Sequence, residues 1–325
     1  MKTVAIIILN WNGKKDTLEC LASLASLTYP HFFTIVVDNH SSDDSCEEIA
    51  KKFPKVMLIQ NQENLGFAEG NNVGIRLALE KKADFLFLLN NDTIVSPSIL
   101  EAFLEAVQKK PQGGIFGGKL YQYHNPSFLD HLGGIWDPKQ GNFRCIGGNE
   151  KASYFYDEPL DYVCGCALFC KKEVIEKIGM LDPRFFLLWE ESDFCFQARH
   201  EGWKVFSVEK AQVWHKGSAS FSGGKPHMHY FWWRNRLLWI EKNLSTKERI
   251  FLYIRVLFPQ ILQVYRRYGK KVLMQKFFAA KQTERKRKEL LHYVAGRQGI
   301  EDYWKRRFGP LPASLWEKIS PSKKN

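Results

Sequence analysis

The sequence predicts an α/β protein with a mostly parallel central sheet, followed by a C-terminal basic helical extension. Strand-like and helix-like segments alternate four times in the first hundred residues, which is typical of a parallel sheet covered by helices. The charge is uneven, because residues 241–325 hold 21 Lys and Arg against 7 Asp and Glu, whereas the whole chain has a formal net charge of +12. We therefore expect a near-neutral domain over residues 1–241 and a basic, amphipathic helical tail over residues 242–325.

The predicted strands of the first domain are apolar runs that end in polar residues. Residues 4–9 form a continuous apolar run, as expected for a strand buried on both faces. Asn10 follows this strand, Asp38 follows the second, and Asn90 and Asp92 follow the fourth. Ligands of such sheets bind beyond the carboxyl ends of the strands, so these side chains are candidate binding residues. Strands are predicted at residues 4–9, 33–37, 56–59 and 85–89, and helices at 14–27, 42–52 and 70–82.

The second half of the chain has a looser pattern. Residues 113–159 are rich in Gly, Asn and aromatic side chains and predict short strands and loops. Helices are predicted at 171–178, 191–200 and 229–241, and a strand at 203–208. No run reaches the ~18 apolar residues that a membrane span needs, and no secretory signal is visible. With seven cysteines and no Cys-x-x-Cys pair, the chain is expected in a reducing, cytoplasmic compartment.

Six short motifs occur in a fixed order along the first 240 residues. They are Ile-Ile-Leu-Asn-Trp-Asn-Gly (7–13), Val-Val-Asp-Asn-His-Ser-Ser-Asp (36–43), Asn-Leu-Gly-Phe-Ala-Glu-Gly-Asn-Asn-Val-Gly (64–74), Leu-Leu-Asn-Asn-Asp-Thr (88–93), Trp-Glu-Glu-Ser-Asp-Phe-Cys (189–195) and His-Lys-Gly-Ser (215–218). Together they resemble the inverting nucleotide-sugar glycosyltransferases of family 2, and within them the rhamnosyltransferase-like branch. The resemblance implies the GT-A nucleotide-sugar-binding fold.

The resemblance implies a donor site at the ends of the first strands. In the family, the acid at the position of Asp38 hydrogen-bonds the nucleobase, and the loop after the first strand flanks the nucleotide. An Asx turn or a helix cap is the alternative role for Asp38. Gly66 and Gly70 permit a close approach of the backbone to a ligand at a helix N-terminus, or they form an ordinary strand-to-helix turn. The predicted donor-binding residues are Asn10, Trp11, Asn12, Asp38, Asn39, Gly66, Asn71, Asn90, Asn91 and Asp92.

The resemblance also implies a divalent cation, Mg²⁺ or Mn²⁺. Asn90-Asn91-Asp92 aligns with the family's Asp-x-Asp element, which holds the cation against the donor diphosphate and so neutralises the charge on the leaving group. Asn90 offers a carbonyl oxygen without charge in place of the first acid, so Asp92 is the main predicted ligand. His215 aligns with a histidine that completes this metal site, and a structural histidine is the alternative.

The predicted catalytic base lies in the acidic segment 189–193. This segment aligns with the family's Glu-Asp-x-Asp stretch, whose second acid strips the proton from the attacking acceptor hydroxyl. That acid is Glu191 here, with Glu190 and Asp193 as alternatives. These acids could instead serve only the dipole of a helix N-terminus. Gly165 and Trp189 are assigned to the acceptor side.

Arg234 and Asn235 follow an aromatic cluster at 230–233 and resemble a late Arg-Asn motif of the family. An arginine at this position could meet a phosphate of the ligand. The alternative for the aromatic cluster is core packing or a contact with another protein.

The tail interleaves Phe, Leu, Tyr and Trp with Lys and Arg over residues 244–310. Basic amphipathic helices of this kind lie on anionic membrane surfaces. We therefore expect a protein that is peripheral at the inner face of the cell membrane. A solvated appendage and a contact in a homo-oligomer are the alternatives, and no specific nucleic-acid partner is expected because no recognised fold for it is present.

The motifs and the resemblance together predict an inverting, metal-dependent hexosyltransferase. It would move a sugar from an NDP-sugar, with dTDP-rhamnose as the candidate donor, to a saccharide or lipid-linked acceptor in cell-surface polysaccharide synthesis. A different class of protein fits the departures at Asn90 and Glu191, namely a non-catalytic nucleotide- or carbohydrate-binding scaffold docked at a membrane by its tail.

Overall fold

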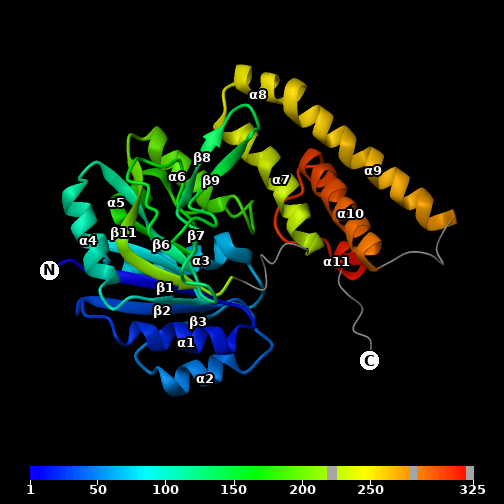
Figure 1. The fold of residues 1–325 in the computed structure, drawn as a ribbon. Helices are drawn as coiled ribbons and strands as arrows, with labels where there is room; N and C mark the ends of the chain where they lie inside the picture. The colour runs from blue at the N-terminus through cyan, green and yellow to red at the C-terminus, as the bar shows by residue number, and fades with distance from the viewer. Residues whose placement is uncertain (218–224, 278–283, 320–325) are drawn as a thin grey trace. The chain divides into compact units, whose positions relative to one another are not determined.

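The computed structural model describes residues 1–217, 225–277 and 284–319 (Figure 1). They form two compact units. The first unit comprises residues 1–135, 144–183 and 190–218, and the second comprises residues 136–143, 184–189 and 219–325. The boundary at residue 241 that the change in charge suggests stays a prediction, since packing divides the chain at other positions.

The first unit is built on a mixed sheet with the strand order β3-β2-β1-β4-β10-β6-β11-β5, and β7 pairs with β6. Strands β1 to β4 are mutually parallel, whereas β10 inserts antiparallel between β4 and β6. The predicted α/β class with a parallel first half is therefore confirmed. The strands of this sheet are β1 (Val4–Asn10), β2 (Phe32–Asp38), β3 (Met57–Gln60), β4 (Phe85–Asn90), β5 (Thr93–Val95), β6 (Gly113–Gln122), β7 (Leu129–His131), β10 (Ala167–Lys171) and β11 (Lys204–His215). A separate hairpin consists of β8 (Gly133–Asp137) and β9 (Asn142–Ile146).

Helices cover both faces of this sheet, and each face has its own hydrophobic core. Strand β1 shows why a continuous apolar run is needed, because Ile7 packs into one core and Ile6 and Ile8 pack into the other. Such alternation leaves no position on a central strand for a polar side chain. The helices on one face are α1 (Lys14–Leu24), α2 (Ser45–Lys52) and α4 (Ile99–Lys109), and those on the other are α3 (Gly66–Glu80), α5 (Lys172–Ile178) and α6 (Glu190–His200).

Two glycines of α3 allow this helix to pack closely on β1. A Cβ atom on Gly70 would lie 2.6 Å from a methyl group of Leu9, and one on Gly74 would lie 2.5 Å from a methyl group of Ile7. Both distances are shorter than real Cβ contacts. Gly70 thus serves helix–strand packing, and its expected role in bringing the backbone close to a ligand stays a prediction.

The looser pattern of residues 113–159 conceals a regular strand. Residues 113–122 form the ten-residue strand β6, although four glycines weaken its sequence signal. At Gly117 a Cβ atom would lie 2.5 Å from Val163, so this glycine is set by close packing. Strand β11 also extends further than the predicted strand at 203–208, because an irregularity between Val208 and Gln212 shifts its register and lets it continue to His215.

The second unit is helical, as the tail composition predicts. Its helices are α7 (Pro226–Asn243), α8 (Thr246–Leu252), the π-helix η1 (Tyr253–Leu257), α9 (Phe258–Phe277), α10 (Glu284–Trp304) and α11 (Ala313–Ile319). Ser245 begins α8 with a capping box to Glu248. Tyr230, Phe231, Ala295 and Leu315 form a small core from α7, α10 and α11. Within the described part of the chain, none of the helices combines the length and the apolar character needed to cross a bilayer.

Gly299 lies where α10 packs tightly against α7, and a side chain at this position should destabilise the second unit. A Cβ atom on Gly299 would lie 2.3 Å from the carbonyl oxygen of Tyr230. Gly299→Ala should therefore lower stability by ~1–3 kcal/mol and lower Tm in a thermal melt. Gly269→Ala is the matched control, since nothing lies within 4 Å of its Cβ position and helix propensity favours Ala. Equal melting temperatures for the two variants would contradict the assigned packing.

Candidate functional site

The polar ends of β1, β2 and β4 are joined by a chain of hydrogen bonds. The Asn10 amide donates to Asp38 (2.7 Å), and the Thr17 hydroxyl donates to the Asn10 carbonyl oxygen (2.6 Å). The Asn91 amide in turn donates to the Thr17 hydroxyl (2.9 Å). Asp38 is buried and also accepts from the backbone and hydroxyl of Ser41, so it holds the loop after β2, a local structural role of the kind that was the alternative. A carboxylate has further lone pairs, and contact with a nucleobase stays a prediction for Asp38.

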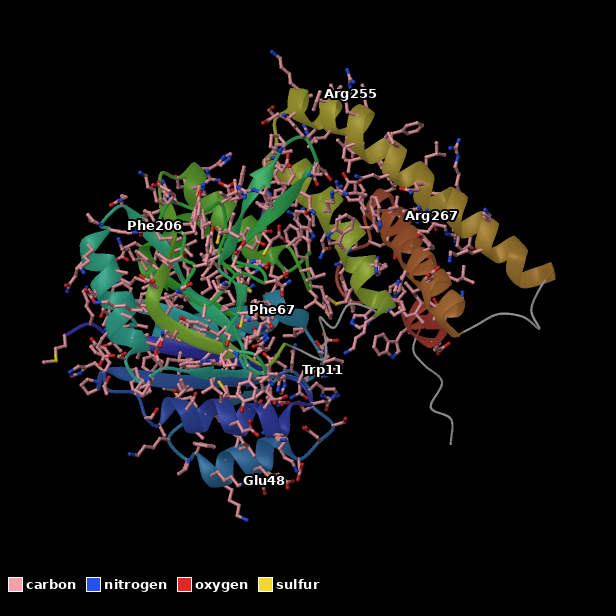
Figure 2. All side chains as sticks on the ribbon, viewed as in Figure 1. Trp11, Glu48, Phe67, Phe206, Arg255 and Arg267 are labelled. Atoms are coloured by element: carbon pink, nitrogen blue, oxygen red, sulfur yellow. The ribbon has the colours of Figure 1, made fainter. Side chains whose placement is uncertain are left out.

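The loop around the end of β1 contains the predicted residues Trp11 and Asn12. Asn12 has a positive φ of 51°. Its side-chain amide oxygen accepts hydrogen bonds from the backbone and hydroxyl of Ser42. Trp11 is 53% exposed, so its indole is available to a ligand. Figure 2 shows Trp11 and Phe67 toward the same edge of the first unit, where β1 ends and α3 begins.

Asn39 holds the loop that leads into α3. Its amide group donates to Asn64 (2.9 Å) and to the Gly66 carbonyl (3.0 Å), and its own oxygen accepts from Asn61 and from the Leu65 backbone. Gly66 has a φ of 77°, a conformation that suits glycine. Asn39 and Gly66 therefore shape this loop, and their binding to the donor stays a prediction. Asn71 is also buried, and its amide donates to the Phe67 carbonyl one turn earlier.

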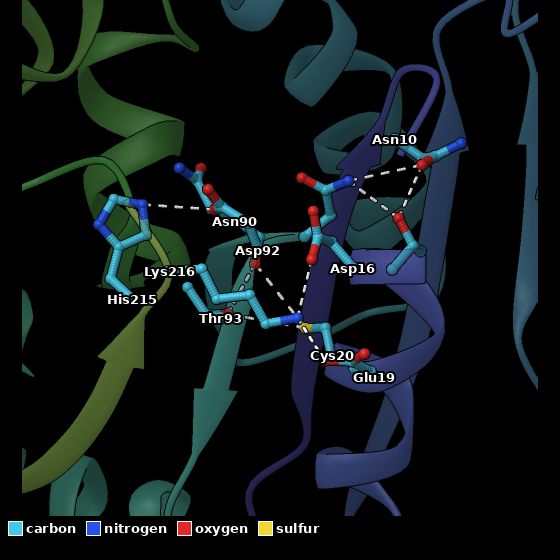
Figure 3. Close-up of polar contacts among 11 residues, drawn as sticks. Asn10, Asp16, Glu19, Cys20, Asn90, Asp92, Thr93, His215 and Lys216 are labelled. Carbon is cyan, nitrogen blue, oxygen red and sulfur yellow. Dashed lines mark hydrogen bonds and ion pairs between the residues drawn. The ribbon is translucent and has the colours of Figure 1, made fainter. Parts of the chain in front are cut away.

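Asp92 and His215 face each other at the junction of β4, β5 and β11 (Figure 3). Strand β5 pairs antiparallel with the end of β11 so that Thr93 lies opposite His215. The Nε2 atom of His215 lies 3.4 Å from an Asp92 oxygen. Both residues are buried, and among the described residues neither oxygen of Asp92 nor His215 Nε2 has a hydrogen-bond partner. Buried polar atoms without partners are costly, so this pair is prepared for a group that the chain itself does not supply.

Asp130 holds the other side of the His215 ring. The Nδ1 atom of His215 lies 2.6 Å from an Asp130 oxygen. Burial lowers the pKa of His215, but the hydrogen bond to Asp130 and the facing carboxylate of Asp92 outweigh burial and raise this pKa to about 10. A carboxylate on one ring nitrogen fixes the orientation of the ring and directs the other nitrogen outward, as in histidines that bind metals. The sequence motifs did not include Asp130.

The Asp92–His215 pair fits the predicted cation. Its donors are carboxylate oxygens and an imidazole nitrogen, which suit Mn²⁺. Among the described residues no group of three His, Cys, Asp or Glu side chains could hold a metal ion. A cation held by this pair would take its remaining ligands from other groups, such as phosphate and water.

Lys216 fixes the end of β11 against α1. Its ammonium group contacts Asp16 (2.8 Å) and Glu19, as Figure 3 shows, and its backbone N–H donates to the Asp92 carbonyl (3.0 Å). Burial lowers the pKa of Lys216, but the two carboxylates raise it by more, so the amine stays charged. The side-chain contacts with α1 and the backbone hydrogen bond to Asp92 together hold the end of β11 and so position His215 next to Asp92.

The three predicted acids begin α6, and they differ in burial. Glu190 and Asp193 are buried, at 4% and 2% exposure, whereas Glu191 is only partly buried. Burial, followed by the charge of Glu191, raises the pKa of Glu190 well above its usual value. Glu190 is therefore pushed toward its neutral form, and Glu191 is the acid of the three with access to a substrate. This difference favours Glu191 as the base, an assignment that stays a prediction.

The segment 164–166 brings the acids and the Asp92–His215 pair into one region of the first unit. A Cβ atom on Gly165 would lie 3.3 Å from Cβ of Glu191, so the predicted acceptor-side glycine lies against the predicted base. Cys164 interacts electrostatically with both His215 and Glu190. Gly165 thus links the start of α6 to this segment, and the joint action of Glu191 and the Asp92–His215 pair on one substrate stays a prediction.

The loop before α6 has an unusual backbone. Phe186, Leu188 and Trp189 all have positive φ values, of 64°, 71° and 76°, which cost free energy in residues other than glycine. The Asn235 amide stabilises this loop by donating to the carbonyl oxygens of Phe185 (2.8 Å), Leu187 (2.7 Å) and Leu188 (2.8 Å). The loop belongs to the second unit together with α7, and chain continuity connects it directly to Glu190.

Arg234 supports the same loop and does not meet a ligand phosphate. Its side chain is fully buried and donates to the carbonyl oxygens of Phe185 (2.8 Å) and Gly309 (2.6 Å). The predicted phosphate contact is therefore wrong, because the buried guanidinium is occupied by backbone carbonyls.

Trp189 is also buried, at 7% exposure. Its ring packs with Phe143 and Trp239 at centroid distances of 5.6 and 5.9 Å. Trp189 is thus part of an aromatic packing cluster, and its acceptor-side role stays a prediction.

Removing the Asn235 amide should lower the free energy needed to unfold the loop or the whole second unit. Asn235→Asp keeps the shape but replaces the donor with an acceptor that faces three carbonyl oxygens. Since each buried group left without its partner costs ~1–3 kcal/mol, we expect the free energy of unfolding to fall by at least ~3 kcal/mol. Chemical denaturation would measure this loss. Asn125→Asp, at an exposed position, is the control and should change stability by less than ~0.5 kcal/mol; a similar value for Asn235→Asp would contradict the assigned role.

Comparison with known proteins agrees with this fold. The family described as Glycosyl transferase family 2 matches residues 5–179, more than half of the chain. The chain therefore belongs to glycosyl transferase family 2.

Among curated relatives, the chain is 24% identical to the N-acetylglucosaminyl-diphospho-decaprenol L-rhamnosyltransferase of Mycobacterium tuberculosis, over 67% of this chain and 82% of that protein. It is also 24% identical to the dTDP-rhamnosyl transferase RfbF of Shigella flexneri, over 76% and 85% of the two chains. A third relative, the low-salt glycan biosynthesis hexosyltransferase Agl10 of Haloferax volcanii, is 24% identical over 65% of this chain, and the match spans 66% of its length, just under two thirds.

Among solved structures, the mannosyltransferase PcManGT of Pyrobaculum calidifontis, in complex with GDP-Man and Mn²⁺, superimposes with a TM-score of 0.55 at 12% identity. The match covers 94% of this chain and 87% of that chain. This likeness, together with the strand order and the helices on both faces, identifies the fold as GT-A.

Proposed function

We propose that this protein transfers a sugar, with inversion at C1, from an NDP-sugar to a hydroxyl group of a saccharide or lipid-linked acceptor. The observation that carries the proposal is the buried Asp92–His215 pair, whose facing atoms lie 3.4 Å apart and make no hydrogen bond with the described residues. The relatives named for rhamnosyl transfer make dTDP-rhamnose the candidate donor and cell-surface polysaccharide synthesis the candidate role.

Asp92 and His215 would hold Mg²⁺ or Mn²⁺, which would neutralise charge on the leaving nucleoside diphosphate. The network from Asp38 through Asn10 and Thr17 to Asn91 fixes the strand ends on which the nucleotide is proposed to lie. Trp11 supplies an exposed ring beside it.

Glu191 is proposed to accept the proton of the acceptor hydroxyl. As that oxygen forms its bond to C1 of the sugar, the bond from C1 to the diphosphate oxygen breaks, and the nucleoside diphosphate leaves on the opposite face. The proton moves to the Glu191 carboxylate, which must be charged beforehand. Burial of Glu190 supports this, since one acid of an adjacent pair in its neutral form lets the other stay ionised.

A proposed location follows from the substrates. An NDP-sugar is water-soluble and a lipid-linked acceptor lies in a membrane, so we place the protein at the cytoplasmic face of the cell membrane.

The test is release of nucleoside diphosphate by the full-length protein from dTDP-, UDP- and GDP-sugars, with and without lipid-linked saccharides. We expect turnover with MnCl₂ or MgCl₂ and a loss on the order of a hundredfold in EDTA, because the cation stabilises the leaving group by several kcal/mol. Full activity in EDTA would overturn the metal assignment. Nucleotide binding without turnover for every donor would instead support a non-catalytic nucleotide-binding protein.

A further inference from the structure

The helix formed by α8, η1 and α9 has an exposed apolar face. Ile250, Phe251, Ile254 and Phe258 are 56%, 52%, 66% and 65% exposed, and Leu262 continues the row at 36%. Large apolar side chains in such a row are uncommon on a protein surface that faces only water, and they mark sites of association.

The π-helix η1 keeps this row straight. Each member of the row lies four residues after the previous one: Ile250, Ile254, Phe258 and Leu262. In an α-helix each step of four residues turns the side chain about 40° further around the helix axis. The π turn at Tyr253–Leu257 is wider than an α turn, so it reverses part of this rotation in the middle of the row. An apolar face that would otherwise spiral around the helix is thereby kept on one side.

The opposite face of the same helix is packed within the second unit. Leu252, Leu257 and Val264 are buried. On α9, Arg267 donates to the Tyr293 hydroxyl of α10 (2.8 Å), and Arg297 of α10 lies over the ring of Tyr268 at 4.4 Å. The exposed row therefore belongs to a helix held firmly in place.

Basic residues accompany the apolar row. Residues 246–277 hold eight Lys and Arg against a single Glu. Arg255, Arg266 and Lys270 are exposed, and Figure 2 labels Arg255 and Arg267 along this helix. An apolar row beside positive charge is complementary to a surface that offers hydrocarbon beneath anionic groups.

The apolar surface continues around Phe251. This residue borders a cavity of about 260 Å³ in the second unit, and most of the cavity lining is apolar. The lining residues are Trp136, Pro138, Leu244, Lys247, Glu248, Phe251 and Leu252. Ile250 and Phe251 thus lie at the edge of a larger apolar area.

We propose that the face of α8, η1 and α9 formed by Ile250, Phe251, Ile254, Phe258 and Leu262 docks on the surface of an anionic phospholipid bilayer. The apolar side chains enter the interface between head groups and acyl chains, and Arg255, Arg266 and Lys270 meet the lipid phosphates. The helix lies along the bilayer without crossing it. The proposal identifies the surface for the peripheral location, but it does not depend on glycosyl transfer.

The experiment is flotation of the full-length protein with vesicles, scored by the protein found with lipid. We expect binding to phosphatidylcholine vesicles in which about one third of the lipid is the anionic phosphatidylglycerol, because basic side chains are attracted to an anionic lipid surface. Binding to pure phosphatidylcholine should be at least about tenfold weaker, and binding to the anionic vesicles should fall as NaCl rises because salt screens the charges.

The test variant is Ile254→Glu with Phe258→Glu, which should lower the partition coefficient by at least about tenfold because both changes remove inserted apolar area. Gln108→Glu with Gln112→Glu is the control, since it adds the same charge at exposed positions of the first unit and should bind like the unchanged protein. Thermal melts and nucleotide binding of both variants would show that each is folded. Undiminished flotation of Ile254→Glu/Phe258→Glu would overturn the proposal, as would absence of binding by the unchanged protein.

A second copy of the chain is the competing occupant of this face. Sedimentation velocity of the unchanged protein separates the two, since membrane docking predicts that the oligomeric state is the same in the test variant. A dimer that Ile254→Glu/Phe258→Glu converts to a monomer, without vesicle binding by either protein, would assign the face to self-association. Lost flotation with normal nucleoside diphosphate release from a soluble acceptor would separate this surface from the catalytic proposal.

Discussion

Glu191→Gln should lower kcat by about 10²–10⁴-fold, the range expected when a general base is removed. The amide keeps the size of the side chain but cannot accept the acceptor proton. Donor binding should change little, because Glu191 lies next to Gly165 and its carboxylate is proposed to act on the acceptor. Steady-state rates of nucleoside diphosphate release, with acceptor varied at saturating donor, would measure the effect.

The alternatives and the control for this prediction come from the same helix and its neighbour. Glu190→Gln should cost far less activity, since burial already favours its neutral form. Glu176→Gln removes one charge at an exposed position of α5 and should leave kcat unchanged. Retention of full activity by Glu191→Gln, or a larger loss in Glu190→Gln, would move the base to another acid.

Asp92→Asn should abolish the response to Mn²⁺ and lower kcat/KM by on the order of 10²-fold or more, because a neutral amide is a poorer ligand for a hard cation. The buried position has no other described carboxylate in contact with His215 Nε2 that could replace it. Mn²⁺ binding can be measured directly by calorimetry in the presence of a nucleoside diphosphate, which gives a readout besides activity.

Asp130→Asn is the informative partner of this variant. Asp130 touches His215 on the Nδ1 side, so its loss should weaken Mn²⁺ affinity by about 10–100-fold, the range for residues that orient metal-binding histidines. Asp157→Asn, at a surface ion pair with Lys110, is the control and should bind Mn²⁺ normally. Mn²⁺ binding by Asp92→Asn that equals the unchanged protein would show that the cation is held elsewhere.

The sequence is sufficient to predict the first hundred residues because their strands are buried on both faces. A central strand such as β1 requires an unbroken apolar run, and the run ends where side chains reach solvent at Asn10. Strand β6 was not recognised for the opposite reason. Its glycines are required by neighbours that are distant in sequence, such as Val163 against Gly117, and no local pattern reports such a contact.

The site shows the same division between local and distant causes. Asp92 and His215 were paired through the order of family motifs, and the structure brings them together through the β5–β11 pairing. The sequence does not reveal Asp130 because this residue contacts His215 from within the short strand β7, whose place is set by pairing with β6. Arg234 was misassigned because an arginine that binds a phosphate and one that binds backbone carbonyls have the same sequence signature; only burial distinguishes them.

A change at Gly165 can move the side chain of Glu191 without changing its carboxylate. Its missing side chain is what allows the 164–166 segment to lie against Glu191 and Phe67, with the nearest heavy atoms 3.3 and 3.6 Å from where a methyl group would stand. An alanine there would press on the stem of the acid by a few tenths of an ångström while its carboxylate stayed the same. Under the proposed role of Glu191 as the base, a substitution at Gly165 would alter the reach of its carboxylate toward acceptor hydroxyl groups, so this position is a place to vary acceptor preference in engineered forms.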